Sequence, residues 1–138
     1  MRIPLQWLKE YVDVTMAPKE LGHHLTMAGL ETGDISVIGQ EWNNIFVGHV
    51  DKVQDHPNAD RLRLATVNLG QKTMTVVCGC PNLAQGQKVA FAKLGAKLTN
   101  PESGKIQTLK AVNIRGFLSE GMVCSERELG LGEDESGI

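Results

Sequence analysis

The most reactive combination of side chains in this sequence lies between Asp55 and Asp60, where His56 stands near two carboxylates. An imidazole supported by carboxylates could act as a general base. A nucleophile for such a base is not evident, because Ser119 and Ser125 have no His or Asp partner that the sequence reveals, although such partners are often distant along the chain. We therefore predict no catalytic residue.

The residue types that follow the histidine are typical of a turn. Pro57 fixes its own φ, while Asn58 and Asp60 carry side chains that can bond to nearby backbone amides. We favour a structural role over a catalytic one for His56, Pro57, Asn58 and Asp60. Such a turn would orient Arg61 and Arg63, which follow it.

The spacing of cysteines and glycines does not indicate a metal, disulfide or phosphate-loop site. The three cysteines are too few and too unevenly placed for a disulfide framework, and Cys78-Gly79-Cys80 is tighter than the usual pairs of zinc ligands. The 15 glycines contain no phosphate-loop or dinucleotide fingerprint. We expect reduced thiols, no metal site and no cofactor in this segment.

The charge is distributed unevenly. The chain of 138 residues has a net charge of −2, but residues 1–44 carry −3, residues 45–125 carry +5 and residues 126–138 carry −4. A basic region between acidic flanks is how a polyanion-binding module could exist in a nearly neutral chain. An ordinary solvated surface of mixed charge remains the alternative.

Nucleic acid is the polyanion that the basic region would bind. The candidate contacts to its phosphates are Lys52, Arg61, Arg63, Lys88, Lys93 and Arg115. Aromatic residues make up only 4% of the chain, and Phe46, Phe91 and Phe117 are those in the basic region. This scarcity favours salt-sensitive contact with a folded RNA backbone over stacking on single-stranded bases.

A second dense motif spans residues 114–125. Gly116 and Gly121 permit tight backbone geometry around a short polar bend. Two interpretations stay open: a strand–turn–strand in a barrel core, or a direct RNA contact through Ser119 and Met122.

Two helices are expected at the start of the chain, over residues 4–12 and from Pro18 to a stop at Gly29. A strand-like stretch follows over residues 34–39, before a turn-rich break. No apolar run approaches the roughly 18 residues of a membrane span. The N-terminus also lacks the continuous apolar core of a signal peptide, so we expect a cytoplasmic protein with no membrane partner.

The sequence pattern after residue 40 is typical of a β protein. We expect strands over residues 45–53, 61–69, 73–78, 88–92, 106–114 and 121–125. Their number and the Gly-, Pro- and Asn-rich turns between them favour an OB-type barrel of five main strands. The predicted class is thus mainly β with an α appendage: a helical segment over 1–39 and a barrel domain over 40–138.

Four motifs resemble the tRNA-binding OB domain found in synthetase appendages and free-standing tRNA-binding proteins. They are His56-Pro57-Asn58-Ala59-Asp60-Arg61-Leu62, Val77-Cys78-Gly79-Cys80-Pro81-Asn82, Gly86-Gln87-Lys88-Val89-Ala90 and Ser119-Glu120-Gly121-Met122-Val123-Cys124-Ser125. The flanks resemble the start of a bacterial-type phenylalanyl-tRNA synthetase β chain, through Trp7-Leu8-Lys9-Glu10-Tyr11-Val12, Leu25-Thr26-Met27-Ala28-Gly29-Leu30-Glu31 and Glu128-Leu129-Gly130-Leu131.

The resemblance implies a parent enzyme that uses ATP and Mg²⁺ to attach phenylalanine to its tRNA as an α2β2 assembly. It implies that catalysis occurs on the α chain and that the helical segment packs with chain beyond residue 138. We therefore expect a non-catalytic tRNA-binding module. The alternatives are a structural or assembly module of the synthetase, and a free-standing tRNA-binding chaperone, which the helical leader disfavours.

Overall fold

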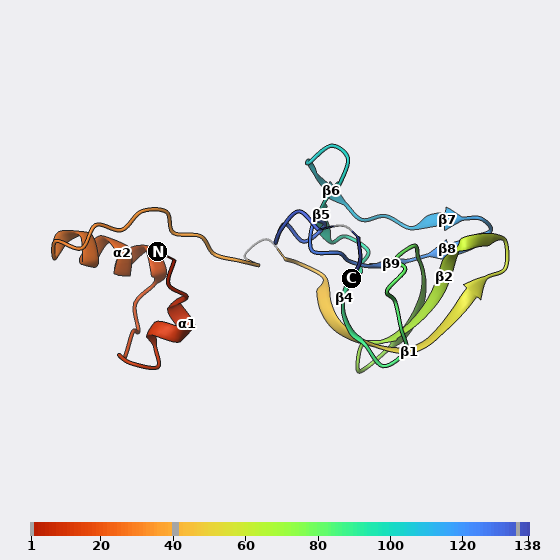
Figure 1. Cartoon of the computed structure of the whole chain (residues 1–138), viewed down its shortest axis with the longest axis horizontal. Coiled ribbons are helices and arrows are strands. Elements are labelled where there is room, and N and C mark those ends of the chain that lie inside the picture. The colour runs from red at the N-terminus through yellow and green to blue at the C-terminus, as the bar shows by residue number, and fades with distance from the viewer. Residues whose placement is uncertain (1, 40–41, 135) are drawn as a thin grey trace. The chain divides into compact units, whose positions relative to one another are not determined.

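The computed structural model describes residues 2–39, 42–134 and 136–138. The chain divides into two compact units, Met1–Ile38 and Gly39–Ile138, which are a helical part and a β-barrel part in Figure 1. The predicted class, mainly β with a short α appendage, is confirmed. No helix within the described ranges is long and apolar enough to cross a membrane.

Helix α1 spans Leu5–Leu8, which is only the first part of the helix predicted over residues 4–12. Beyond it the chain continues in turns, in which the amide of Glu10 bonds to the carbonyl of Trp7 at 3.1 Å. A single helical turn closes few hydrogen bonds for the residues that it orders, so it depends on packing. No residue of α1 is buried, which explains why the helix is short.

Helix α2 spans Pro18–Met27 and begins at the predicted proline. Gly29 ends it with a φ of 90°. The amide of Gly29 bonds to the carbonyl of Thr26 at 3.0 Å, and that of Leu30 to the carbonyl of Leu25 at 2.9 Å. These are the two hydrogen bonds of a Schellman motif, so the predicted helix stop has its expected physical cause.

The strand predicted over residues 34–39 is wrong, because the described residues there form no strand. The chain returns along α2 instead. Thr32 Oγ1 donates to the carbonyl of Gly22 at 3.0 Å, and the side chain of Ile35 occupies the space that a Cβ on Gly22 would need. A strand requires a neighbouring strand to satisfy its backbone groups, and residues 2–38 contain none.

The second unit is built on a five-stranded antiparallel sheet in the order β3-β2-β1-β4-β9, which curls into a nearly closed barrel (Figure 1). The strands are β1 Ile45–His56, β2 Ala59–Asn68, β3 Thr73–Cys78, β4 Lys88–Lys93 and β9 Gly121–Val123. All five overlap predicted strands, and the OB-type barrel is confirmed.

Two small hairpins lie between β4 and β9. Strand β5 Lys97–Thr99 pairs with β6 Ile106–Thr108, and β7 Val112–Ile114 pairs with β8 Phe117–Ser119. The prediction of one continuous strand over 106–114 is therefore wrong, and β5 and β8 were not predicted. Strands of three residues are too short for a recognisable alternation of apolar and polar side chains.

Apolar side chains from alternate strand positions fill the barrel. Val50, Val67, Val76 and Phe91 are fully buried. Gly121 on β9 faces the same interior, where a Cβ would collide with the ring of Phe91. This close approach is the physical reason for a glycine at position 121.

A second apolar cluster covers the outer side of β4 and β9. Ala92, Ala96, Leu98 and Cys124 form its buried part, and Met122 packs against them. Successive side chains of a strand point to opposite faces, so β4 supplies Phe91 to the barrel and Ala92 to this outer cluster. The cluster thereby attaches the β5 region to the barrel.

Candidate nucleic-acid interface

His56 lies at the end of β1 with 5% of its surface exposed. Its Nδ1 accepts the backbone amide of Asn58 at 3.1 Å, so the proton of the neutral ring is assigned to Nε2, which donates to the carbonyl of Ile114 at 3.2 Å. The ring also meets Phe117 edge-on, with centroids 6.4 Å apart. Both ring nitrogens are occupied within the fold, an arrangement that suits a structural histidine rather than a general base.

Asn58 forms a second link between the same two hairpins. Its Nδ2 donates to the carbonyl of Arg115 at 3.1 Å, 57 positions further along the chain. The amide side chain therefore bonds to a distant carbonyl and not to the nearby amides that the turn prediction invoked. We call His56, Asn58, Ile114, Arg115 and Phe117 the hairpin latch, since they join the β1–β2 turn to the β7–β8 turn; these ends meet at the right of the barrel in Figure 1.

The backbone of Arg115 adopts an unusual conformation. Arg115 has a φ of 51° and Gly116 a φ of 90°, and the amide of Gly116 bonds to Asn113 Oδ1 at 2.9 Å. Two positive φ angles are the requirement of a type I′ turn, which favours Gly, Asn and Asp. In a non-glycine residue this region costs about 1–2 kcal/mol. Asn44 is the other described non-glycine residue with a positive φ, and its type tolerates that conformation.

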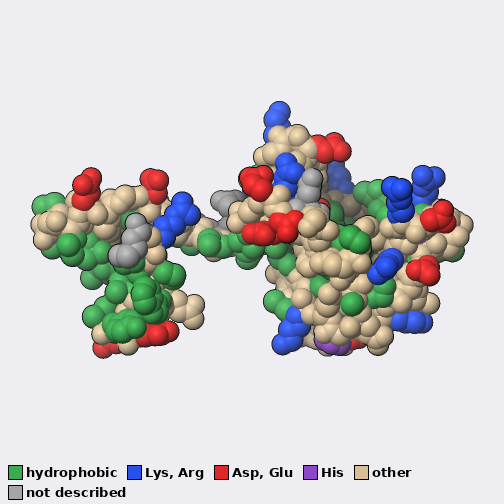
Figure 2. All heavy atoms as spheres, viewed as in Figure 1, with side chains coloured by type: hydrophobic (Ala, Val, Ile, Leu, Met, Phe, Trp, Pro, Cys, Tyr) green, Lys and Arg blue, Asp and Glu red, His purple; other side chains and the backbone are tan. Residues whose placement is uncertain are grey.

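The other predicted cations do not gather into one cluster. Lys52 lies opposite Thr66 on the sheet, Lys88 opposite His49, and Lys93 at the far end of β4, with its ammonium 4.3 Å from the ring centroid of Phe46. A strand of 12 residues such as β1 is about 40 Å long at 3.3 Å per residue. Figure 2 shows basic side chains scattered over the visible face of the barrel unit.

The end of the barrel that holds the hairpin latch carries two exposed cations. Arg61 lies on β2, just after the β1–β2 turn. Arg115 lies in the β7–β8 turn, which the hairpin latch joins to the β1–β2 turn. Arg63, by contrast, is half-buried and donates from Nη1 to the carbonyl of Leu83 at 3.1 Å. Arg63 therefore fixes the segment before β4, and we leave it out of the interface proposed below.

The two predicted contacts of the second motif, Ser119 and Met122, pack against other parts of the barrel unit. Ser119 is 5% exposed; its hydroxyl donates to the carbonyl of Gly121 at 3.0 Å and accepts the amide of Val77 at 3.2 Å. Met122 packs against the outer cluster. These positions correspond to the strand–turn–strand interpretation, and we leave Ser119 and Met122 out of the interface as well.

Few aromatic surfaces in the described part of the barrel unit are available for base stacking. Phe91 is fully buried, and Phe117 packs against His56. Phe46 is 43% exposed, with Lys93 over its ring. Proteins that bind single strands usually stack successive bases on several aromatic rings. The geometry thus favours contact with the nucleic-acid backbone.

Comparison with known families identifies the barrel. Residues 45–138 match the family model described as a putative tRNA binding domain. The chain belongs to this family. The predicted resemblance to tRNA-binding OB domains, placed near residues 40–130, is therefore confirmed.

The relatives of this tRNA-binding domain agree over the whole chain. Phenylalanine–tRNA ligase beta subunits are 49% identical in Dehalococcoides mccartyi (strain ATCC BAA-2266 / KCTC 15142 / 195), 44% in Syntrophus aciditrophicus (strain SB) and 45% in Protochlamydia amoebophila (strain UWE25). Each match covers 100% of this chain but only 17%, 16% and 17% of the respective relative. The chain spans about a sixth of the length of the relatives that it matches.

Two of the three thiols of the tRNA-binding domain, those of Cys80 and Cys124, are poor nucleophiles. Cys78, Cys80 and Cys124 are free. Burial, with a smaller contribution from Cys78, raises the pKa of Cys80 to about 12, and burial followed by the charge of Glu128 raises the pKa of Cys124 to about 12. Since the thiolate is the reactive form, neither cysteine is suited to covalent catalysis at neutral pH.

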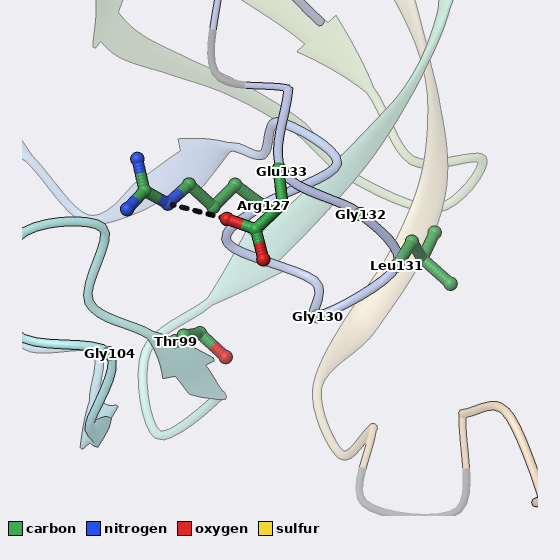
Figure 3. Close-up of a pocket in the computed structure, with 7 residues that line it drawn as sticks. All are labelled: Thr99, Gly104, Arg127, Gly130, Leu131, Gly132 and Glu133. Carbon is green, nitrogen blue, oxygen red and sulfur yellow. Dashed lines mark ion pairs between the residues drawn. The ribbon is translucent and has the colours of Figure 1, made fainter.

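A shallow cavity of about 270 Å³ lies apart from the hairpin latch of the tRNA-binding domain (Figure 3). Its lining includes Thr99, Leu131 and the ion pair of Arg127 Nε with Glu133 Oε2 at 3.9 Å. Mixed charge and three glycines give it little chemistry for a specific ligand. Among the described residues no group of three or more His, Cys, Asp or Glu side chains could hold a metal ion.

The hairpin latch was not predicted from the sequence. The local signal for its second half was Gly116, the one residue of the central pair whose type suits a type I′ turn. No local pattern could show that Asn58 bonds to the carbonyl of Arg115, because that contact joins two hairpins distant in sequence.

Proposed function

We propose that this chain is the tRNA-binding module of a phenylalanine–tRNA ligase β subunit and that it holds tRNA by its phosphates at the latched end of the barrel. The site is chosen because Arg115 is an exposed cation whose backbone has an energetically unfavourable conformation. Residues strained in this way persist where the surrounding structure fixes them, and they cluster at functional sites. The family match supplies the class of ligand.

The mechanism of binding is electrostatic. Arg61 and Arg115 contact phosphates at the latched end, while Lys52, Lys88 and Lys93 add weaker contacts along the barrel. Each phosphate that is neutralised releases counterions, so affinity falls as salt rises. The positions of the cations on separate strands suit a folded RNA surface, whose backbone bends around the barrel, better than an extended strand.

The names of its relatives support a proposal for the activity of the whole protein. In the complete ligase, which uses ATP and Mg²⁺ to attach phenylalanine to its tRNA in the cytoplasm, this module orients tRNA and supplies no catalytic group. The ligase contains a synthetase α chain in an α2β2 heterotetramer. Because the relatives are much longer than this chain, we place the partner-binding parts outside residues 1–138 and the catalytic parts outside this module.

The N-terminal unit has a different task, which is assembly. Among its described residues only Gly22 is buried, whereas Trp7, Tyr11, Met27 and Ile38 are exposed. An apolar surface of this kind requires a partner. We propose that residues 1–39 form part of a domain completed by chain that follows residue 138, and that the barrel over 40–138 is a separate domain.

A titration tests the tRNA-binding proposal. We expect a fluorescently labelled phenylalanine tRNA transcript to bind the chain, with affinity falling roughly tenfold or more between about 50 and 200 mM salt if three or more phosphates are contacted. A single-stranded RNA of equal length should bind more weakly. Failure of the folded tRNA to bind even at the lower salt would contradict the proposal but leave the family membership intact.

Charge reversal separates tRNA binding from a purely structural role of the barrel. Changing Lys88, Lys93 and Arg115 to Glu in the full-length ligase should weaken tRNA binding. The matched control changes Lys72, Lys97 and Lys105 to Glu. Unchanged tRNA binding in the first variant would favour the alternative, an assembly module.

Deletion tests the role of the N-terminal unit. Removing residues 1–38 from the full-length ligase should lower the temperature at which the ligase unfolds. The reason is that the segment after residue 138 that packs against residues 1–38 would lose its partner. The same deletion from the 138-residue chain should leave the unfolding of the barrel unchanged. A full-length ligase that tolerates the deletion would contradict the assembly role.

A further inference from the structure

We infer that Asn58 is a positioning residue for RNA binding, which acts by holding the backbone of Arg115 so that its guanidinium is presented to a phosphate of folded RNA. The inference rests on the proposed function, since it concerns the same end of the barrel. It adds a mechanism: the two turns are joined before RNA arrives, so the cation is preorganised.

The two turns that the latch joins are located where OB barrels bind ligands. In such barrels the loop between the first two strands and the long connection before the last strand adjoin the binding face. Here the first is the β1–β2 turn at Pro57-Asn58, and the second contains the β7–β8 turn at Arg115-Gly116. A hydrogen bond between these loops therefore fixes their relative position at the proposed binding face.

The hairpin latch extends from the buried side chain of His56 to the exposed turn at Arg115. His56 is buried, and its Nε2 donates to the carbonyl of Ile114 at 3.2 Å. The amide of Asn58 bonds back to Nδ1 of the same ring at 3.1 Å, which fixes both the tautomer and the position of residue 58. From that position Asn58 Nδ2 reaches the carbonyl of Arg115 at 3.1 Å.

Arg115 needs such support, because its φ of 51° is unfavourable for an arginine. Gly116 and the bond to Asn113 Oδ1 maintain the turn from within the hairpin, and Asn58 holds it from outside. Among the described residues no hydrogen bond or ion pair of the Arg115 guanidinium is found, so the charge is available to a ligand. Fixing its backbone reduces the entropy that is lost when it binds.

A double-mutant cycle tests the inference with the 138-residue chain and labelled phenylalanine tRNA transcript. The variants are Asn58→Ala, Arg115→Asn and the double mutant. Asparagine at 115 tolerates the positive φ and removes the guanidinium without changing the turn. We expect Arg115→Asn to weaken binding about tenfold and Asn58→Ala about threefold, and the double mutant to be no weaker than Arg115→Asn alone.

The salt dependence supplies a readout that a purely structural role would not change. Arg115→Asn should lower the slope of log Kd against log salt by about 1, since one phosphate contact is lost. Asn58→Ala removes no charge, yet it should lower the slope in the same direction, because Arg115 no longer stays at its phosphate. Thr66→Ala, which removes the exposed bond to Thr75 at 3.2 Å, is the matched control and should not change the slope.

The outcomes distinguish the inference from the function on which it rests. If RNA binds and the Asn58→Ala and Arg115→Asn losses multiply in the double mutant, Asn58 acts independently of Arg115 and the inference is overturned, while the function stands. If wild-type chain binds no RNA, both are overturned. Asn58→Ser, which also loses the amide donor, replaces Asn58→Ala if circular dichroism shows that the alanine variant is unfolded.

Discussion

The hydroxyl of Ser119 accepts the backbone amide of Val77 at 3.2 Å and joins β3 to β8 across the seam of the barrel. The two residues lie 42 positions apart, and their strands are not neighbours in a hydrogen-bonded ladder. The same hydroxyl donates to the carbonyl of Gly121, so one side chain satisfies two backbone groups at the place where the sheet does not close.

Ser119→Ala should therefore lower the free energy of unfolding by about 1–3 kcal/mol, because a buried amide and a buried carbonyl both lose their partner. Urea denaturation followed by circular dichroism measures the change. Ser103→Ala, at an exposed position in the β5–β6 loop, is the control and should change stability little. Equal stability of the two variants would show that the seam does not depend on Ser119.

Arg115→Gly should change stability and RNA binding in opposite directions. Glycine adopts a positive φ without steric cost, so the free energy of unfolding should rise by up to about 1 kcal/mol, less the entropy cost that glycine carries. Affinity for tRNA should fall, because the cation is lost. Thermal unfolding and anisotropy titration of the same preparation check both signs. A variant that is less stable, or that binds as tightly, would contradict the role assigned to Arg115.

Gly121→Ala should destabilise the barrel by about 1–3 kcal/mol, the usual cost of overpacking a well-filled core. A Cβ at position 121 meets the ring of Phe91 and the carbonyl of Ala92, and the backbone carbonyl cannot move aside without loss of the β4–β9 pairing. Gly79→Ala is the matched control, since its Cβ would meet only Leu62 at an ordinary distance of 3.6 Å. Denaturation midpoints should separate the two variants clearly.

The half-buried thiol of Cys80 and the buried thiol of Cys124 predict a loss of stability at alkaline pH. The pKa of Cys80 and that of Cys124 are both raised from 9.0 to about 12, chiefly by burial. Between these values the unfolded chain releases thiol protons that the folded chain retains, so the free energy of unfolding falls as pH rises above 9. Below pH 9 both states keep the protons and the contribution is fully present.

Denaturation midpoints at about pH 8 and pH 10.5 test this dependence. The Cys80→Ala/Cys124→Ala double variant should lose less stability between the two pH values than wild type, with the difference assigned to the thiols. Both thiols should also react slowly with iodoacetamide at pH 8 in the folded chain and quickly after denaturation. Rapid alkylation of the native protein would contradict the raised pKa values.

The sequence by itself determined the architecture and the family, and it did so through local patterns. The hairpin-length connection at residues 70–72, which contains a glycine, predicted β3 from Thr73 to Cys78 with the limits that the structure has. Pro18 and Gly29 predicted the two ends of α2. These features depend on the intrinsic geometry of a few neighbouring residues, which is why they could be predicted. The motifs from His56 to Ser125 indicated the tRNA-binding barrel before any fold was known.

Only the tertiary structure decided which of the predicted contact residues are exposed and which are held within the fold. Arg63 and Arg115 look alike in the sequence, yet Arg63 bonds to the carbonyl of Leu83 while Arg115 stands exposed on a strained turn. Ser119 proved to be buried at the seam. The carbonyls and amides that fix these roles come from segments tens of residues away, and they meet only when the barrel closes. The local sequence therefore does not show which distant backbone group a side chain bonds to.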